Sequence, residues 1–333
     1  MRSSGLIDLQ VNGYAGVDFN SAAITAGALD HALAAMLDAG VTQCLPTLIT
    51  APAAELAARF AALDRAVHAS RLGPGMVPGY HLEGPFLNAS PSYAGCHPPA
   101  AMISPDSALV DRLEVSLHRP ILLITLAPEL AGAEKFIRWA RGRGKLVALG
   151  HTGASAPEIT RAADAGAGMS THLGNALSAP VHKFDNPLMA QLAEDRLAAS
   201  FIADGIHIPS AALKIFFRAK GLDRIVLVTD ATAAAGAPPG LYDFAGMRIA
   251  HMADGTVRVP GGQTLAGSSL RLDQAVRNVV AWQLATPEQA VGLASTNPAA
   301  LLAPALAFHG IGLAPCVLEW DAALRPRVVT RPG

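Results

Sequence analysis

Short apolar runs alternate with longer alanine-rich segments along most of the chain. Strands that are buried on both faces carry continuous rather than alternating hydrophobic residues, so each run is predicted to be a strand of a parallel sheet. The segments between them have helical spacing, and several end at a glycine, as helices often do. The predicted strands are Leu6–Val11, Val41–Leu45, Met76–His81, Ile121–Leu126, Leu146–Leu149, Met169–Leu173, Leu197–Ile202 and Ile225–Thr229.

This alternation predicts an α/β protein with a (β/α)8 TIM barrel over residues 1–303, and a doubly wound parallel sheet is the alternative. One segment departs from the pattern. Residues near 241–260 alternate apolar and polar side chains and contain Asp254-Gly255, which predicts a β-hairpin inserted after the eighth strand. Residues 304–333 are predicted to form a tail with short strands.

Composition narrows the functional classes. Of 333 residues, 51% are hydrophobic and 15% are charged, and the net charge is −1. Without basic runs, nucleic acid is not an expected partner. No stretch approaches the roughly 20 apolar residues that span a bilayer, and the N-terminus does not resemble a signal peptide, so we expect no membrane partner and a cytoplasmic location. Three widely spaced cysteines argue against a disulfide framework and against a thiolate zinc site.

Side chains that can bind a metal ion or transfer a proton follow several of the predicted strands. Glu83, His151, His172 and Asp230 each lie at or just after a strand's carboxyl end. In a barrel these ends open onto one face, where barrel enzymes build their active sites. One Glu and two His can bind a zinc-type ion and leave a position for water. Taken singly, each has an ordinary explanation as a paired buried residue, a helix cap or a turn residue. Their joint placement favours a metal site, with Asp230 able to accept a proton from water.

At these residues the sequence resembles the amidohydrolase superfamily, and within it the N-acetylglucosamine-6-phosphate deacetylases. The matching segments run in the family's order over about residues 5 to 300. They include "HLEGPFLN", "AGCHPP", "GHTGAS", "THLGNAL", "ADGIHIP", "VTDATAAAG" and "LAGSSL". Such a series is more specific than any one motif.

The resemblance implies roles for individual residues. Glu83, His151 and His172 would bind one divalent ion, with zinc the first choice and iron, cobalt or manganese as alternatives. Asp230 would be the catalytic acid and base, and His97 a catalytic hydrogen-bond donor that also contacts the substrate. A homodimer is expected. The remaining implied substrate contacts are Cys96, Asn175, Ala176, His207, Leu265, Ala266 and Gly267.

The chain departs from the family pattern in several places. Many amidohydrolases have a His-x-His pair at the end of the first strand, where this chain has Gln10 and Asn12, so one metal is expected rather than two. Asp185 stands where the family has a phosphate-binding arginine, although His182 or Lys183 could substitute. Gly174 replaces a larger residue, and the family's small β-sandwich is expected to be reduced or absent.

The sequence therefore predicts a metal-dependent deacetylase. It would hydrolyse the N-acetyl amide of an amino sugar, N-acetylglucosamine-6-phosphate or a close relative, to the free amine and acetate. Asp185 keeps open an amidohydrolase acting on a non-phosphorylated N-acyl amino sugar or another N-acyl amino compound. The alternative from another class is a catalytically idle barrel that only binds its ligand.

Overall fold

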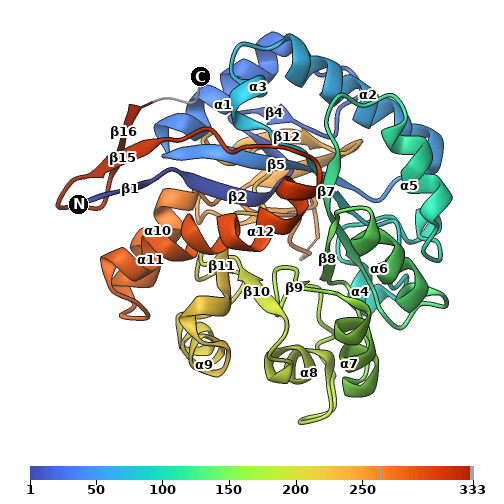
Figure 1. The fold of residues 1–333 in the computed structure, drawn as a ribbon. Helices are drawn as coiled ribbons and strands as arrows, with labels where there is room; N and C mark the ends of the chain where they lie inside the picture. The colour runs from blue at the N-terminus through green and yellow to red at the C-terminus, as the bar shows by residue number, and fades with distance from the viewer. Residues whose placement is uncertain (263, 331–333) are drawn as a thin grey trace.

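The computed structural model describes residues 1–262 and 264–330 and shows a barrel of parallel strands surrounded by helices (Figure 1). Eight strands form one sheet in the order β11-β10-β9-β8-β7-β6-β5-β2, so chain neighbours are also sheet neighbours. The TIM-barrel prediction is confirmed. The barrel strands are β2 (Leu6–Val11), β5 (Val41–Ile49), β6 (Tyr80–Glu83), β7 (Ile121–Leu126), β8 (Leu146–Leu149), β9 (Met169–Ser170), β10 (Ala198–Phe201) and β11 (Ile225–Leu227).

The two ends of this sheet meet, which closes the ring. Val11 bridges in parallel to Ala231, just after β11. The backbone N–H of Asp230 donates to the Gln10 carbonyl at 2.9 Å, and that of Asn12 donates to the Ala231 carbonyl at 2.7 Å. The carboxyl ends of the first and last barrel strands are therefore held side by side.

The third strand differs from its prediction. The sequence suggests Met76–His81, but β6 begins at Tyr80, and Gly73–Met76 is a short helix, α3. Proline in the first turn of a helix has a suitable φ and lacks only an N–H that would be unpaired there, so Gly73-Pro74 favours helix over strand. As a result, Glu83 is the last residue of β6 rather than a residue beyond it.

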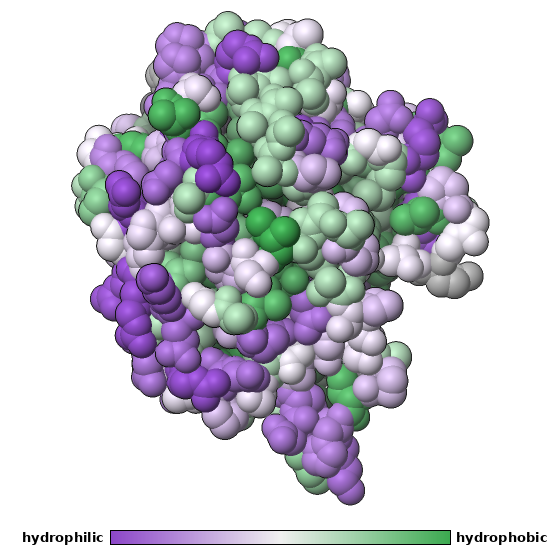
Figure 2. Space-filling view, turned by 90° about the vertical axis from the view of Figure 1, so that its right-hand side faces the viewer, coloured by the Kyte–Doolittle hydropathy of each residue, from purple (hydrophilic) through white to green (hydrophobic). Residues whose placement is uncertain are grey.

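The helices cover the outside of the barrel (Figure 1). Figure 2 shows the surface on the side of α2, α5 and α6, where hydrophilic residues are interspersed with weakly hydrophobic ones, as expected of alanine-rich amphipathic helices. The other helices are α1 (Ala26–Asp38), α2 (Ala53–Ala69), α4 (Pro91–Ala94), α5 (Ser107–Glu114), α6 (Ala133–Gly142), α7 (Ala156–Ala165), α8 (Pro187–Ala193), α9 (Ser210–Lys220), α10 (Leu272–Ala281), α11 (Pro287–Leu293) and α12 (Thr296–Phe308), with 3-10 turns at Pro99–Ala101 and Leu222–Arg224.

Three small sheets accompany the barrel. One consists of β12 (Gly240–Phe244), β13 (Met247–His251) and β14 (Val257–Arg258). Its first turn is at Ala245-Gly246, where both φ values are positive, as a two-residue hairpin turn requires, whereas Asp254-Gly255 lies between β13 and β14. Another sheet joins the two ends of the chain. It contains β1 (Arg2–Ser4), β15 (Val317–Trp320) and β16 (Pro326–Thr330). The third sheet has two strands, β3 (Gly13–Tyr14) and β4 (Val17–Asp18).

Helix α12 lies across the end of the barrel where the strands begin (Figure 1), in contact with β2, β7, β8 and β11. The Asn297 side-chain amide donates to the carbonyls of Leu222 and Ile225 at 2.7 and 2.8 Å. The stretch Pro287–Phe308 is long and apolar enough to cross a membrane by length and composition. It consists of two helices, and several of its apolar side chains, among them Val291, Leu302 and Leu306, are buried in the core of the barrel.

Asp8 is a buried carboxyl group inside the closed ring. Its oxygens accept hydrogen bonds from the Thr229 hydroxyl at 2.5 Å, the Thr229 N–H at 3.2 Å and the Gln10 N–H at 3.3 Å. Burial raises the pKa of Asp8 from 3.8 to about 7. Asp8 therefore binds a proton in the folded chain at pH values where the unfolded chain has lost it.

A pH-dependent stability follows from this burial. The stability linked to Asp8 is fully present below pH 3.8 and is lost as the pH rises through about 7. Asp8→Asn imitates the protonated acid at every pH. Between pH 5 and pH 8, the unfolding free energy of the wild type should therefore fall by on the order of 2 kcal/mol more than that of the variant. Urea unfolding at both pH values measures this. An equal pH slope in wild type and variant would contradict it.

Candidate metal centre and active site

Three of the predicted site residues lie just after barrel strands, at backbone positions with positive φ angles. His151, His172 and Asp230 follow β8, β9 and β11, and their φ angles are 51°, 29° and 49°. Non-glycine residues rarely adopt positive φ, and such positions cluster at functional sites because the surrounding structure must hold them there. At each strand end the chain turns sharply, and the site therefore begins directly at the barrel mouth.

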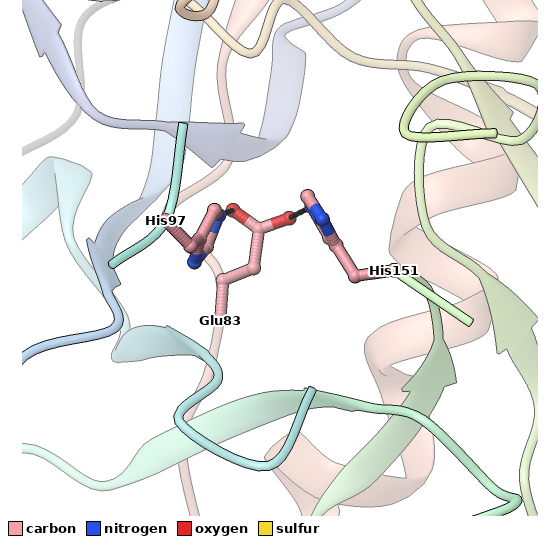
Figure 3. A group of neighbouring side chains, drawn as sticks. All are labelled: Glu83, His97 and His151. Atoms are coloured by element: carbon pink, nitrogen blue, oxygen red, sulfur yellow. Dashed lines mark ion pairs between the residues drawn. The ribbon is translucent and has the colours of Figure 1, made fainter. Parts of the chain in front are cut away.

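The side chains of Glu83, His151 and His172 converge at this mouth. His172 Nε2 lies 2.9 Å from Glu83 Oε1, and His151 Nε2 lies 3.5 Å from the same oxygen. The two imidazole Nε2 atoms are 3.2 Å apart. In Figure 3 the Glu83 carboxylate lies between the rings of His151 and His97. Glu83, His97 and His151 also form a group whose ligand atoms are all within 4.8 Å of one another.

These spacings fit a divalent metal ion. Bonds of about 2.0–2.1 Å to a tetrahedral ion place neighbouring ligand atoms roughly 3.3 Å apart, close to the three separations among Glu83, His151 and His172. The tautomer of one imidazole also fits. His151 Nδ1 donates to the Tyr93 carbonyl at 2.8 Å, which leaves the Nε2 lone pair free for a metal.

The electrostatics of the cluster keep its carboxylate charged. Burial would raise the pKa of Glu83, but hydrogen bonds with His151 and His172 hold it well below its usual range. Burial would likewise lower the pKa of His172, but the hydrogen bond and charge of Glu83 raise it to about 8. A buried carboxylate beside two imidazoles is a set of donor atoms suited to a zinc-type ion.

His97 reaches the same carboxylate from the loop after β6. Its Nε2 lies 3.7 Å from Glu83 Oε2, while Nδ1 shares a 2.8 Å hydrogen bond with the Thr50 hydroxyl. Burial, together with the nearby His151, lowers the pKa of His97 to about 3. The loop itself turns at Gly84, where φ is +84° and a Cβ atom would lie 2.1 Å from the Thr50 Oγ1 atom.

Asp230 is held by two amides from the end of β2. Asn12 Nδ2 donates to its Oδ1 at 2.7 Å, and Gln10 Nε2 donates to the same oxygen at 3.2 Å and to Glu83 Oε1 at 2.9 Å. Burial, followed by the charge of Glu83, raises the pKa of Asp230 to about 6. The amides that replace a His-x-His pair thus position two carboxylates. Their place in the sequence predicts only that a second metal is not bound there; the hydrogen bonds to Asp230 and Glu83 come from the structure.

One cavity of about 320 Å³ contains this cluster. Small-molecule sites typically occupy roughly 300–1,000 Å³. Ala266, a predicted substrate contact, is not among the described residues that line it, because it is buried in a small core with Phe244 and Ile249. The predicted site residues that do line the cavity are Glu83, Cys96, His97, His151, His172, Asn175, Ala176, His207, Asp230, Leu265 and Gly267.

The Thr50–His97 hydrogen bond gives a testable effect on activity. Thr50→Val removes the hydroxyl at nearly constant volume, so His97 loses the group that fixes its ring. We expect a fall in kcat/KM of about 10-fold or more, the size seen when outer hydrogen-bond partners of site residues are removed. Thr50→Ser keeps the hydroxyl and should stay within about 3-fold of wild type by the same reasoning. Equal losses in both variants would argue against the hydrogen bond.

A scan against models of known protein families finds no match. Individual proteins do match. The chain is 38% identical over 298 residues to the N-acetylgalactosamine-6-phosphate deacetylase of Escherichia coli O157:H7, covering 89% of this chain and 76% of the relative. It is 38% identical over 312 residues to the N-acetylglucosamine-6-phosphate deacetylase of Bos taurus, covering 90% and 73%. The chain belongs to the N-acetylglucosamine-6-phosphate deacetylase family.

Solved structures of this family have the same fold. The N-acetyl-D-glucosamine-6-phosphate deacetylase of Mycobacterium smegmatis superimposes with a TM-score of 0.87 at 31% identity, covering 100% of this chain and 86% of that one. The family resemblance seen in the sequence is confirmed. As a member of this deacetylase family, the chain is an amidohydrolase of amino sugar metabolism.

Proposed function

We propose that this enzyme removes the acetyl group from an N-acetylated amino sugar at the barrel mouth, with one divalent ion held by Glu83, His151 and His172. The observation that supports it most strongly is the near-tetrahedral spacing of these three ligand atoms. Three protein ligands leave a position open, as catalytic zinc sites require. His97 is nearest to the other carboxylate oxygen, Oε2, which suits a role beside the ion rather than on it.

Zinc is the ion that this ligand set favours, and when bound it would supply Lewis-acid polarisation of the amide carbonyl and activation of the attacking water. The chain supplies the proton transfers. Asp230, oriented by Gln10 and Asn12, accepts a proton as the water oxygen bonds to the carbonyl carbon. Asp230 then gives the proton to the amide nitrogen as the carbon–nitrogen bond breaks. Acetate and the free amine are the products.

His97 has a separate task in this scheme. When the Thr50 hydroxyl donates to Nδ1, the proton of the neutral ring lies on Nε2, inside the cavity. From there it can donate a hydrogen bond to the carbonyl oxygen as negative charge develops on it. The neighbouring Asn175 and His207 line the same cavity and would contact the sugar.

Acetate release by metal-replete enzyme tests the proposal. The substrates are N-acetylglucosamine and N-acetylgalactosamine, each with and without a 6-phosphate, since the relatives are named for the two 6-phosphates. Acetate from at least one of the four is expected. Its absence from all four, with one metal ion bound per chain, would refute the proposal and favour an idle binding protein. The homodimer and the cytoplasmic location stay predictions.

A further inference from the structure

Glu129 is a half-buried carboxylate in the loop that follows β7. Its Oε2 accepts a hydrogen bond from the Thr152 hydroxyl at 2.5 Å, and its Oε1 accepts one from the Gly153 backbone N–H at 2.8 Å. Thr152 and Gly153 are the two residues directly after His151. Both oxygens of one carboxylate are therefore bonded to the turn that presents a proposed metal ligand.

This turn needs support because its backbone is strained. His151 has a φ of 51°, and a non-glycine residue keeps such a conformation only where the surrounding structure holds it. Hydrogen bonds to a carboxylate are roughly twice as strong as those between neutral groups. The Thr152 hydroxyl also accepts the Ala154 N–H at 2.9 Å, which extends the support past the turn. Without these bonds the backbone at His151 is expected to relax and carry its ring away from the other ligands.

The same carboxylate holds the loop after β6. Asn88 Nδ2 donates to Glu129 Oε1 at 2.8 Å, and the Asn88 backbone N–H donates to the His151 carbonyl at 3.1 Å. The Oδ1 atom of Asn88 accepts the N–H of Ser90 at 2.9 Å. Ser90 directly precedes α4, so Asn88 connects Glu129 to the start of this short helix.

Helix α4 in turn sets the orientation of the His151 ring. The carbonyl of Tyr93, in α4, accepts the hydrogen bond from His151 Nδ1 at 2.8 Å. The Tyr93 ring packs on the same turn, since a Cβ atom at Gly153 would lie 2.7 Å from its Cε2 atom. Outer hydrogen bonds of this kind fix the ring of a ligating histidine. Glu129 thus acts on the His151 backbone directly and on its ring through the Asn88 loop.

We infer that Glu129 is a positioning residue of the metal centre, which joins the loops after β6 and β8 and holds His151 in place for ion binding. Glu129 is not among the described residues that line the cavity, so it acts through its neighbours. The inference rests on the proposed metal site of Glu83, His151 and His172. It adds a residue that determines how well this site is formed.

Glu129→Leu tests this role, because leucine removes all three hydrogen bonds at similar volume. Zinc affinity, measured by competition with a chelator on the folded protein, should fall by about 10–100-fold, the range for outer partners of metal ligands. Glu129→Gln keeps an acceptor oxygen for Asn88 and Gly153 and should stay within about 5-fold of wild type on the same grounds. Glu288→Leu, the same change at an exposed site on α11, should bind zinc as the wild type does.

Two results would overturn the inference. One is wild-type zinc affinity in folded Glu129→Leu, because a carboxylate that only stabilises its loops lowers the melting temperature of the metal-free protein and leaves ion binding unchanged. The other is an equal loss of affinity in the leucine and glutamine variants, which would assign the effect to charge rather than to hydrogen bonding. Circular dichroism and thermal unfolding of the metal-free proteins accompany each titration.

Thr152 gives a milder test that stays decisive if Glu129→Leu does not fold. Thr152→Val removes the hydroxyl that donates to Glu129 at nearly constant volume, and should weaken zinc binding about 10-fold. Thr152→Ser keeps the hydroxyl and should lie within about 3-fold of wild type for the same reason. Equal affinities in the two variants would contradict the role of Glu129.

These outcomes are distinct from failure of the proposed function. Wild-type protein that binds no ion, or that binds it equally well after Glu83→Gln, would refute the proposed metal site itself. A wild-type site that loses its ion in Glu83→Gln but keeps full affinity in Thr152→Val would refute only the role of Glu129.

Discussion

An Asp230→Asn enzyme should lose about 10³-fold or more in kcat and keep its full complement of metal. The proposed mechanism uses Asp230 both to take a proton from water and to return it to the leaving nitrogen, and positioned acid–base groups contribute roughly 10²–10⁴-fold. Asparagine has nearly the same shape and can still accept the hydrogen bond from Asn12. The ligands Glu83, His151 and His172 are untouched, so metal binding should survive.

Steady-state acetate release and metal analysis of the same preparation measure the two effects together. Glu288→Gln is a matched control, because Glu288 is exposed on α11. A variant at position 230 that turns over at the wild-type rate would remove Asp230 from the chemistry. Loss of metal from that variant would show that Asp230 is needed for ion binding.

Glu83→Gln is expected to have the other large effect, on metal content itself. Glu83 supplies the carboxylate that faces the Nε2 atoms of His151 and His172. A neutral amide is a weaker ligand for a divalent ion. Replacing even an outer hydrogen-bond partner costs 10–100-fold in metal affinity, so removing this ligand should cost at least about 10²-fold. The purified variant should hold well under one ion per chain and release little acetate.

Competition with a chelator of known affinity measures this loss. The Glu288→Gln enzyme again serves as the control, since it makes the same chemical change far from the site. Circular dichroism should show both variants folded. Unchanged metal affinity in Glu83→Gln would mean that the ion, if any, is held elsewhere.

The barrel could be predicted from the sequence because its strands are short, apolar and regularly spaced. The strands β2, β7 and β8 have their predicted bounds. The predicted strand boundaries are wrong where residues such as proline favour another backbone conformation in an apolar segment. The third predicted strand included Met76, which belongs to the short helix favoured by Gly73-Pro74. A hydrophobic pattern alone does not separate these outcomes.

The candidate site was predictable only in part, since its partners come from distant segments. Residues at strand ends could be placed together because parallel strands share one open face. Hydrogen bonds between side chains of different strands could not be predicted in this way. The Thr50 hydroxyl, which bonds to His97, is an example. The spacing of Gln10 and Asn12 did carry a signal, because residues two apart in a strand point to the same side. Both amides reach Asp230.

Barrel closure also bears on how the chain folds during synthesis. The open edge of β2 pairs near Ala231, and β1 pairs with β15, more than 300 residues away in sequence. At ribosomal rates of about 5–20 residues per second, these edges stay unpaired for roughly ten seconds or longer. An exposed strand edge invites association with other chains. Newly made protein should thus depend on chaperones chiefly until the last barrel strand has left the ribosome.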